Sequence, residues 1–528
     1  MGLFGDIRKY YTFCKGLRGF LVEPLSLAKS KQTIIKNAER REELFLNLLE
    51  KSVYNNDKSP YRRILNHVGY SFKDIKGLLH RIGLEHTLRR LYEDGIYLTF
   101  DEFKGRRTVH RGGKEFHLLE SDFDNPLLGS SFDVRSGGTL GPGTRTMIDF
   151  DFLSYDAAHR AMALDIYGLM DVPCILWFPV LPGNAGIMNV FRQVKIDRPP
   201  MNWFSQVDSK TFKPSIKDRL ATRFSLLAGR LFGTSMPSPE YVDLNEAHRI
   251  AEFLYQVLQE HPKCAVWTYV SSAIRICMAA RHRSLDLGGI NFFVSGESVT
   301  STKLEEIRSA GAHAIPYFAF VEGGIAAYGC PHPTCPDDMH VLKDRMALIT
   351  HERTVQHSQD VLHALLFTSL LPESPKILLN VETGDQGVVS SHRCSCAFEN
   401  IGFSDHLSSV TSFEKLTSEG MTFMLHDLLH IVEEVLPKKH GGSSADYQLL
   451  EKSNDHGVTS IDILASPRIG NLDEGDVINT LLEGLARQAD SKRLMTQVWL
   501  NADTIHVKRT DPVPTSRGKI FPMRHGEE

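Results

Sequence analysis

The chain has 528 residues, of which 42% are hydrophobic and 23% charged, enough for two or three domains with large cores. Its 60 lysines and arginines nearly balance 64 aspartates and glutamates, so no general basic field points to a nucleic-acid partner. The sequence has neither an apolar run long enough to span a membrane nor a clear signal peptide, so we expect a cytoplasmic protein.

The N-terminal stretch MGLFGDIRKYYTFCKGLRGFL mixes basic and apolar side chains. This pattern fits an amphipathic helix that either binds a surface or packs on its own domain, and we favour packing. Helical periodicity continues over residues 30–54 and 74–93. We expect residues 1–60 to form an N-terminal helical extension.

Strand-like apolar runs and helical stretches then alternate along the chain. Strands are predicted within 172–182, 291–298 and 312–324, and helices over 244–260 and 301–310. This alternation predicts an α/β domain with mostly parallel sheets, whose strands end in the small residues typical of ligand sites.

The character of the chain changes near residue 405. The remaining elements predict a small, mobile α+β lid domain over 406–528, after a large domain over 61–405 that would bind ATP and the acyl group. The predicted elements of the small domain are a helix over 418–437, strands over 447–453 and 460–467, and a helix over 473–489.

The stretch SGGTLGPGTRT at 136–146 contains four glycines, a proline and four small hydroxyl residues. Such a loop leaves backbone amides open to an anion such as phosphate. An ordinary surface loop is the alternative. Pro142 stands where a phosphate-binding lysine would be expected, and Arg145 is the nearest cation.

Three further stretches carry polar residues at positions suited to chemistry. Glu322 ends the apolar run YFAFVEGG, Asp385 lies in VETGDQG, and Lys519 follows a glycine in PTSRGKIFPMR. Taken singly, a strand-end carboxylate is often a helix cap, a TGD stretch is often only a tight turn, and a lysine in a polar tail is often only solvated.

The eight cysteines are unevenly distributed. Four of them, Cys14, Cys174, Cys264 and Cys277, are isolated and are expected to be small buried hydrophobic residues. The others fall in two short stretches, GCPHPTCPDDMH at 329–340 and RCSC at 393–396. In a cytoplasmic chain this clustering favours a metal site over a disulfide.

In this order the motifs resemble the adenylate-forming superfamily, which includes acyl-CoA synthetases, and within it the phenylacetate–CoA ligase-like branch. The resemblance runs from about residue 61 to residue 519. The glycine loop is similar to the phosphate loop of that branch, and FFVSGESV to the turn beside the adenine. YFAFVEGG is similar to the aromatic-to-Glu motif, TGD to the ribose-binding turn, and RGK to the stretch with the final catalytic lysine.

The resemblance implies an ATP-dependent ligase that forms an acyl adenylate from a small-molecule carboxylic acid and releases pyrophosphate. Glu322 would hold Mg²⁺, Asp385 the ribose hydroxyls, and Lys519 would bridge the acid and the α-phosphate. Gly296 and Glu297 would lie beside the adenine. The phosphate loop would use Ser136, Gly137, Gly138, Thr139, Gly141 and Thr144, with Arg145 as the candidate replacement for the missing lysine.

Some members of this branch hold a structural zinc, and the resemblance places its ligands by position. They would be Cys330, His340, Cys394 and Cys396, a closed tetrahedral set of three sulfurs and one nitrogen. His332 and Cys335 are rival ligands in the same loop.

The resemblance also implies transfer of the acyl group to a thiol, either coenzyme A or the phosphopantetheine of a carrier protein. Several residues depart from the branch pattern, among them Val321, Phe403 and the stretch TSFEKLTSEG at 411–420. Two alternatives therefore stay open: transfer to an amine in amide synthesis, and a nucleotide-binding relative without turnover.

An acyl pocket is expected between the 174–190 stretch, the helix over 268–282 and the strand that bears Phe318 and Phe320. Aromatic and apolar side chains in these segments favour an aryl or other apolar acid.

Overall fold

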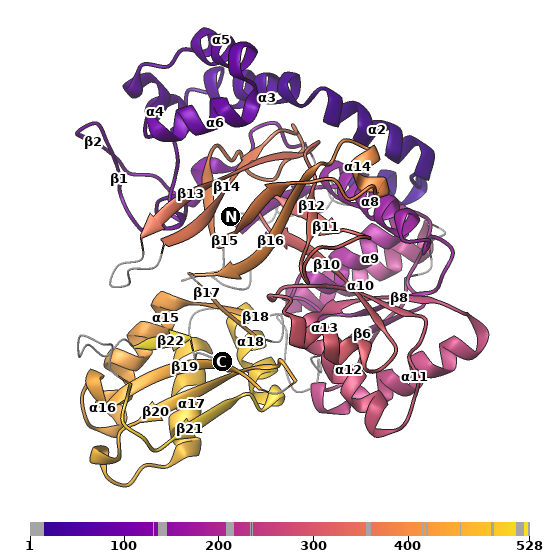
Figure 1. Ribbon diagram of the computed structural model, residues 1–528, viewed down its shortest axis with the longest axis vertical. Coiled ribbons are helices and arrows are strands. Elements are labelled where there is room, and N and C mark those ends of the chain that lie inside the picture. The colour runs from indigo at the N-terminus through magenta and orange to yellow at the C-terminus, as the bar shows by residue number, and fades with distance from the viewer. Residues whose placement is uncertain are drawn as a thin grey trace.

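The computed structural model describes residues 15–129, 131–135, 145–206, 216–232, 234, 236–354, 361–413, 415–418, 421–454, 456–486, 490–513 and 522–525. A large part is built on one twelve-stranded sheet, and a smaller C-terminal part on a four-stranded sheet (Figure 1). This architecture confirms the predicted class, a large α/β domain followed by a small α+β domain.

One half of the large sheet is parallel, with the strand order β10-β9-β8-β5-β6-β7. Every residue of its central strands β5 and β8 is buried, as expected for strands covered on both faces. The strands are β5 (Cys174–Trp177), β6 (Asn202–Ser205), β7 (Pro239–Tyr241), β8 (Cys264–Tyr269), β9 (Ile290–Ser295) and β10 (His313–Phe320).

The other half is antiparallel and continues from β10 as β11-β12-β16-β15-β14-β13. The sequence predicted mostly parallel sheets and did not foresee this half. Short connections such as 321–323 join adjacent strands without a crossover helix, which forces them to run antiparallel. The strands are β11 (Gly324–Gly329), β12 (Met339–Val341), β13 (Met346–Thr354), β14 (Val361–Ser369), β15 (Val381–Ser391) and β16 (Asp405–Ser412).

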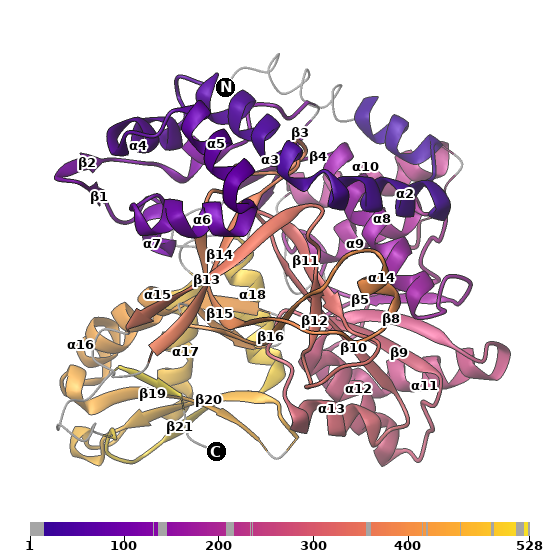
Figure 2. The same ribbon diagram turned by 45° about the horizontal axis from the view of Figure 1, so that its top comes forward.

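Helices cover both faces of the parallel half (Figure 2). On one face lie α8 (Phe150–Ile166), α9 (Ala185–Lys195) and α10 (Ile216–Leu231). On the other lie α11 (Ala247–Glu260), α12 (Val270–His282) and α13 (Ser301–Arg308). These helices confirm the predictions over 244–260 and 301–310.

The N-terminal region is helical, as predicted. Its later helices, from residue 45 on, pack across the antiparallel half of the sheet, whereas residues 27–39 pack on α8 (Figure 1). Residues 15–22 form a helix whose Leu17, Phe20 and Leu21 are buried in the main core, so this part packs on the protein itself. The further elements are α2 (Leu27–Glu39), α3 (Arg41–Leu49), η1 (Glu50–Tyr54), α4 (Pro60–Val68), α5 (Phe72–Ile82), α6 (Leu84–Glu93), α7 (Phe100–Phe103), β1 (Val109–Arg111) and β2 (Lys114–Phe116).

The C-terminal part begins with a hairpin of β17 (Lys415–Ser418) and β18 (Met421–Met424), so the prediction of a helix from 418 was wrong for this stretch. Thr417, Thr422 and Phe423 favour a strand there. Helical structure starts only with α15 (Leu425–His430), and it continues as η4 (Ile431–Val435) and α16 (Leu436–His440).

A four-stranded sheet with the order β21-β20-β19-β22 completes the C-terminal part. The strands predicted over 447–453 and 460–467 and the helix over 473–489 are confirmed, while α18, β21 and β22 were not predicted. The elements are β19 (Tyr447–Ser453), β20 (Thr459–Ala465), α17 (Glu474–Ala486), α18 (Asp490–Ala502), β21 (Ile505–Lys508) and β22 (Met523–His525).

Helix α18 docks the C-terminal part onto the large one. Asn245 Nδ2 donates to the Asn501 carbonyl at 2.7 Å, and Arg275 Nη2 donates to the Ala502 carbonyl at 2.8 Å.

The domain boundaries at 60 and 405 stay predictions, and the large sheet runs on through Ser412 of β16. Among the described helices, none has the length and apolar character that crossing a membrane requires.

Candidate functional site

Glu322 lies in the short connection between β10 and β11, where it is held by a lysine. Lys104 Nζ lies 2.5 Å from Glu322 Oε1 and 2.8 Å from Glu120 Oε1. The Lys104 side chain is only 6% exposed. Burial alone would lower its pKa, but Glu322 and Glu120 together raise it, so the lysine stays charged between two carboxylates.

Sequence reasoning missed Lys104. It follows α7, 218 residues before Glu322, and nothing in its local sequence separates it from a surface lysine. The one signal available is its place directly after the apolar pair Phe100 and Phe103, whose rings it approaches at 5.8 and 5.2 Å.

Gly296 and Glu297 follow β9 at the carboxyl end of the parallel half. Gly296 has a φ of 85°, the left-handed conformation that glycine adopts without strain. Ser271 Oγ, in the first turn of α12, donates to Glu297 Oε1 at 2.6 Å, and Lys303 Nζ lies 3.9 Å from Oε2. The acidic side chain is therefore fixed by two helices.

Asp385 lies inside β15 and not in the tight turn that its glycine-rich surroundings suggested. The strand tolerates the glycines because Gly384 has a φ of 82° and the pairing with β16 shifts register between Gln386 and Val388. Thr383 Oγ1 donates to Asp385 Oδ2 at 2.9 Å, and Ser412 Oγ donates to Oδ1. The carboxylate is thus oriented by two hydroxyls.

Strand β16 links the two predicted nucleotide-binding turns. Ser298 Oγ, next to Glu297, donates to the Val410 carbonyl at 2.9 Å. Two residues later along β16, Ser412 pairs with Asp385. The structure therefore brings Glu297 and Asp385 to the same part of the sheet from positions far apart in the sequence.

The glycine loop connects two paired strands, β3 (Ser131–Arg135) and β4 (Arg145–Asp149), and β4 leads directly into α8. The loop residues Ser136, Gly137, Gly138, Thr139, Gly141 and Thr144 lie outside the described residues. The same holds for Lys519 and for the side chain of Arg145.

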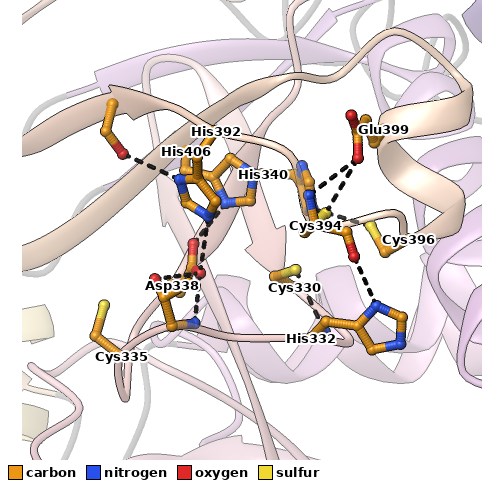
Figure 3. Close-up of polar contacts among 12 residues, drawn as sticks. Cys330, His332, Cys335, Asp338, His340, His392, Cys394, Cys396, Glu399 and His406 are labelled. Carbon is orange, nitrogen blue, oxygen red and sulfur yellow. Dashed lines mark hydrogen bonds and ion pairs between the residues drawn. The ribbon is translucent and has the colours of Figure 1, made fainter.

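Four predicted metal ligands meet beside β12 (Figure 3). Cys330, His340, Cys394 and Cys396 each offer a ligand atom, and these atoms lie within 4.8 Å of one another. His340 Nε2 lies 3.1 Å from Cys396 Sγ and 3.5 Å from Cys394 Sγ. Residues from three separate segments thus converge on one point.

The chemistry of this set fits zinc. His340 Nδ1 donates to the Phe403 carbonyl at 2.6 Å, which leaves Nε2 with its lone pair toward the thiols. Burial, with the neighbouring His406, lowers the pKa of His340 to about 4, so its ring is neutral near pH 7. Burial raises the pKa of the Cys330 and Cys396 thiols, so deprotonating them without a metal is unfavourable. A divalent cation would stabilise the thiolates and offset this free-energy cost.

Backbone geometry holds the Cys-x-Cys segment in place. Glu399 Oε2, on α14 (Ala397–Asn400), accepts hydrogen bonds from the amides of Cys394 at 3.0 Å and Ser395 at 2.6 Å. Ser395 adopts a φ of 57°, in the left-handed region. A carboxylate that holds two successive amides can offset the strain of such a turn.

The rival ligands do not join this group. His332 Nδ1 is hydrogen-bonded to the Cys394 carbonyl at 2.8 Å, and Cys335 lies beside Asp337, 3.9 Å from its Oδ1. A second group, which the sequence did not predict, shares Cys330 and adds Asp338 and His406. His406 Nδ1 lies 2.6 Å from Asp338 Oδ1, and His406 lies beside the His340 ring in Figure 3.

The isolated cysteines behave as predicted where the structure describes them. Cys174, Cys264 and Cys277 are buried and reduced, and Cys14 lies outside the described residues.

No family model and no curated protein matches the sequence. A 2-hydroxyisobutyryl-CoA ligase, solved with 2-HIB-AMP and CoA in the thioesterification state, resembles the structure with a TM-score of 0.50 at 12% identity. The match covers 96% of this chain and 91% of that chain. An amide bond synthetase variant from Marinactinospora thermotolerans reaches a TM-score of 0.36 at 9% identity, over 93% of this chain and 97% of that one. The first likeness shows a shared fold.

Proposed function

We propose that this protein, whose fold is that of the adenylate-forming ligases, activates a carboxylic acid with ATP and releases pyrophosphate. The observation that carries the proposal is the placement of three carboxylates on one sheet of that fold. Glu297 and Glu322 follow the adjacent strands β9 and β10, and Asp385 on β15 is joined to the Glu297 turn through β16. The fold match covers 96% of the chain and includes its small C-terminal part.

The reaction is an in-line displacement at phosphorus. A carboxylate oxygen of the acid bonds to the α-phosphorus of ATP as the bond to the bridging oxygen breaks, and pyrophosphate leaves with the electron pair. Such a step depends mainly on positioning and on neutralising charge. Mg²⁺ would supply part of that neutralisation, held by Glu322, since a single carboxylate together with phosphate oxygens suits this ion.

The other residues would bind and orient the nucleotide. Asp385, whose oxygens are already oriented by Thr383 and Ser412, would accept the ribose hydroxyls. Glu297 would lie beside the adenine, and Lys519 would bridge the acid and the α-phosphate as a compact cation. The amides and hydroxyls of the glycine loop, with Arg145, would hold the outer phosphates.

We further propose that Cys330, His340, Cys394 and Cys396 bind zinc in a structural role. A closed set of four ligands leaves no open position for a substrate. The neutral imidazole and the three clustered thiols support this assignment.

For the second half-reaction we propose a thiol acceptor, either CoA or a carrier-protein phosphopantetheine. The ligase that shares the fold was solved with CoA, which supports a thiol. The stretch TSFEKLTSEG, which resembles the Glu-Lys element of amide-forming relatives, favours an amine as the second candidate. We expect a cytoplasmic enzyme that acts on a small molecule, without nucleic acid.

The test is pyrophosphate release measured across a panel of aryl and aliphatic acids, with and without ATP. Release that requires both an acid and ATP supports the proposal. Absence of release with every acid would contradict it and favour the nucleotide-binding alternative. Adding CoA or a primary amine substrate to an active mixture, and identifying whether a thioester or an amide forms, then separates a thiol acceptor from an amine acceptor.

A further inference from the structure

Arg160 of α8 is a buried cation that forms no ion pair with any described residue. Its side chain is 0% exposed, and its guanidinium lies 3.7 Å from the centre of the Trp267 ring on β8. Nη2 donates to Asn189 Oδ1 on α9. Within the described part of the chain, Nε and Nη1 have no hydrogen-bond partner. A buried cation in this state is costly, so the position suits an anionic partner.

The arginines next to Arg160 show the contrast. Asp156, one helical turn earlier on α8, pairs with Arg192 at 2.7 Å and with Arg345 at 2.5 Å. Two arginines thus share one aspartate, and Arg160, one turn further along α8, is a third cation without an ion pair among the described residues. Burial lowers the pKa of Arg160, and the nearby Arg192 adds to this effect.

Other buried polar groups around Arg160 are also unsatisfied within the described residues. They are the indole Nε1 of Trp267, both amide atoms of Gln193 and the hydroxyl of Tyr328. Gln193 lies one turn after Asn189 on α9, and the Tyr328 ring lies 6.5 Å from that of Trp267. Most of these atoms are donors, so a ligand with several acceptor lone pairs would satisfy them together. A carboxylate has that chemistry.

Contacts lead from this region toward two segments of the proposed ATP site. The Tyr317 ring packs 5.4 Å from Trp267, and Tyr317 is hydrogen-bonded to Ser295, the residue before Gly296. On the other side, Arg345 Nη2 donates to the Gly323 carbonyl, next to Glu322, at 3.0 Å. Two of the segments that meet here, the start of α9 and the strand β10, belong to the acyl pocket expected from the sequence.

We propose that Arg160 anchors a second carboxylate of the acid substrate, so that the protein activates one end of a dicarboxylic acid. This inference rests on the proposed function, because the other carboxylate is the one that ATP activates. It replaces the apolar acid expected from the sequence with a diacid whose second carboxylate would meet Arg160 beside the Trp267 ring.

The first experiment measures binding without turnover, using matched probes that differ only in the second carboxylate. The probes are glutarate against pentanoate and terephthalate against 4-methylbenzoate, and the readout is the melting temperature of the full chain. We expect the diacids to raise the melting temperature of the wild type more than their partners do. Arg160→Met should abolish this difference, and Arg160→Lys should restore part of it.

The second experiment measures acid-dependent pyrophosphate release with the same pairs. A preference of about tenfold or more for one diacid over its partner is expected in the wild type, and its loss in Arg160→Met. Should Arg160→Met fail to fold, Gln193→Leu serves as the second variant. It removes the unsatisfied amide atoms of Gln193 and should weaken the preference for the diacid.

The outcomes separate the two proposals. Suppose that pyrophosphate is released with a monoacid, and that Arg160→Met changes neither the diacid stabilisation nor the diacid preference. This result would overturn the diacid inference and leave the proposed function standing. Diacid stabilisation that depends on Arg160, without any release, would support the anion site and contradict the proposed function. No extra stabilisation and no preference with either diacid would also overturn the inference.

Discussion

The cysteine–histidine cluster and the proposed nucleotide site lie on the same large sheet, but they are assembled differently. In the cluster, His340 lies on β12, Cys330 directly follows β11, and Cys394 and Cys396 directly precede α14. The proposed nucleotide site combines residues at β9, β10 and β15 with Lys104 of the N-terminal region. It would also use a loop and a lysine that lie outside the described residues.

The difference lies in what each site needs for its work. A closed metal site needs its ligands fixed, and here the ligand atoms already lie within 4.8 Å of one another. A site that binds ATP, acid and acceptor in turn needs groups that exchange partners during turnover. Glu322, paired with Lys104 in this structure, is such a group if it takes up Mg²⁺.

The largest effect is expected at the metal cluster. Cys396→Ser removes one of four ligands, so the purified protein should lose its equivalent of zinc, measured by elemental analysis. Loss of a structural metal lowers the free energy of unfolding by more than about 4 kcal/mol. Cys277→Ser, a matched change at another buried cysteine, should keep the metal. Full zinc content in Cys396→Ser would contradict the assigned ligand set.

The next effect is expected at Lys519. Lys519→Ala should lower acid-dependent pyrophosphate release by about 10²–10³-fold, the usual loss when one donor to a developing charge is removed. The zinc content should stay unchanged, which separates the two sites. Release that is unaffected by the substitution would show that the C-terminal lysine plays no part in adenylation.

A smaller effect is expected at Lys104, which we regard as a positioning residue for Glu322. Lys104→Met should lower kcat by up to about 10²-fold, the loss that a small misplacement of a positioned group can cause. The Mg²⁺ concentration needed for half-maximal rate should fall, since Glu322 then carries its charge without a competing cation.

Lys376→Met is the matched control for this change. Lys376 is a second buried lysine, 2.7 Å from Asp124 and 3.0 Å from the Glu120 carbonyl, but it does not contact Glu322. Its replacement should lower stability without moving the Mg²⁺ response. A Mg²⁺ response that shifts equally in both variants would assign Lys104 a purely structural role.

The smallest effect is expected from Glu399, which holds the amides of Cys394 and Ser395 but is no ligand itself. Glu399→Ala should weaken zinc binding by about tenfold, at the low end for outer residues of metal sites, measured by competition with a chelator. Glu399→Gln keeps an acceptor oxygen and should recover most of the affinity. An unchanged affinity in Glu399→Ala would show that the turn at Ser395 needs no such support.

The sequence was most informative where a property depends on neighbouring residues. The period of apolar side chains predicted β19 and α17, and the spacing within GCPHPTCPDDMH and RCSC predicted a metal site. The spacing alone did not choose among His332, Cys335 and the four ligands. The tertiary structure favours His340 over His332 as a ligand, because the His332 ring is hydrogen-bonded to the Cys394 carbonyl and His340 Nε2 lies beside the thiols.

Other features depend on residues far apart in the chain, and the sequence could not show them. The antiparallel half of the sheet depends on which strands lie next to one another in space. The apolar runs in the sequence contain no information on this adjacency. The pairing of Lys104 with Glu322, and the lack of an ion pair for Arg160 among the described residues, arise from three-dimensional packing. By itself, therefore, the sequence determined the local elements, the motif order and the chemical types at each site. The tertiary structure alone decided which charges meet and which are left unpaired, because electrostatic energy depends on distance and burial in space and not on separation along the chain.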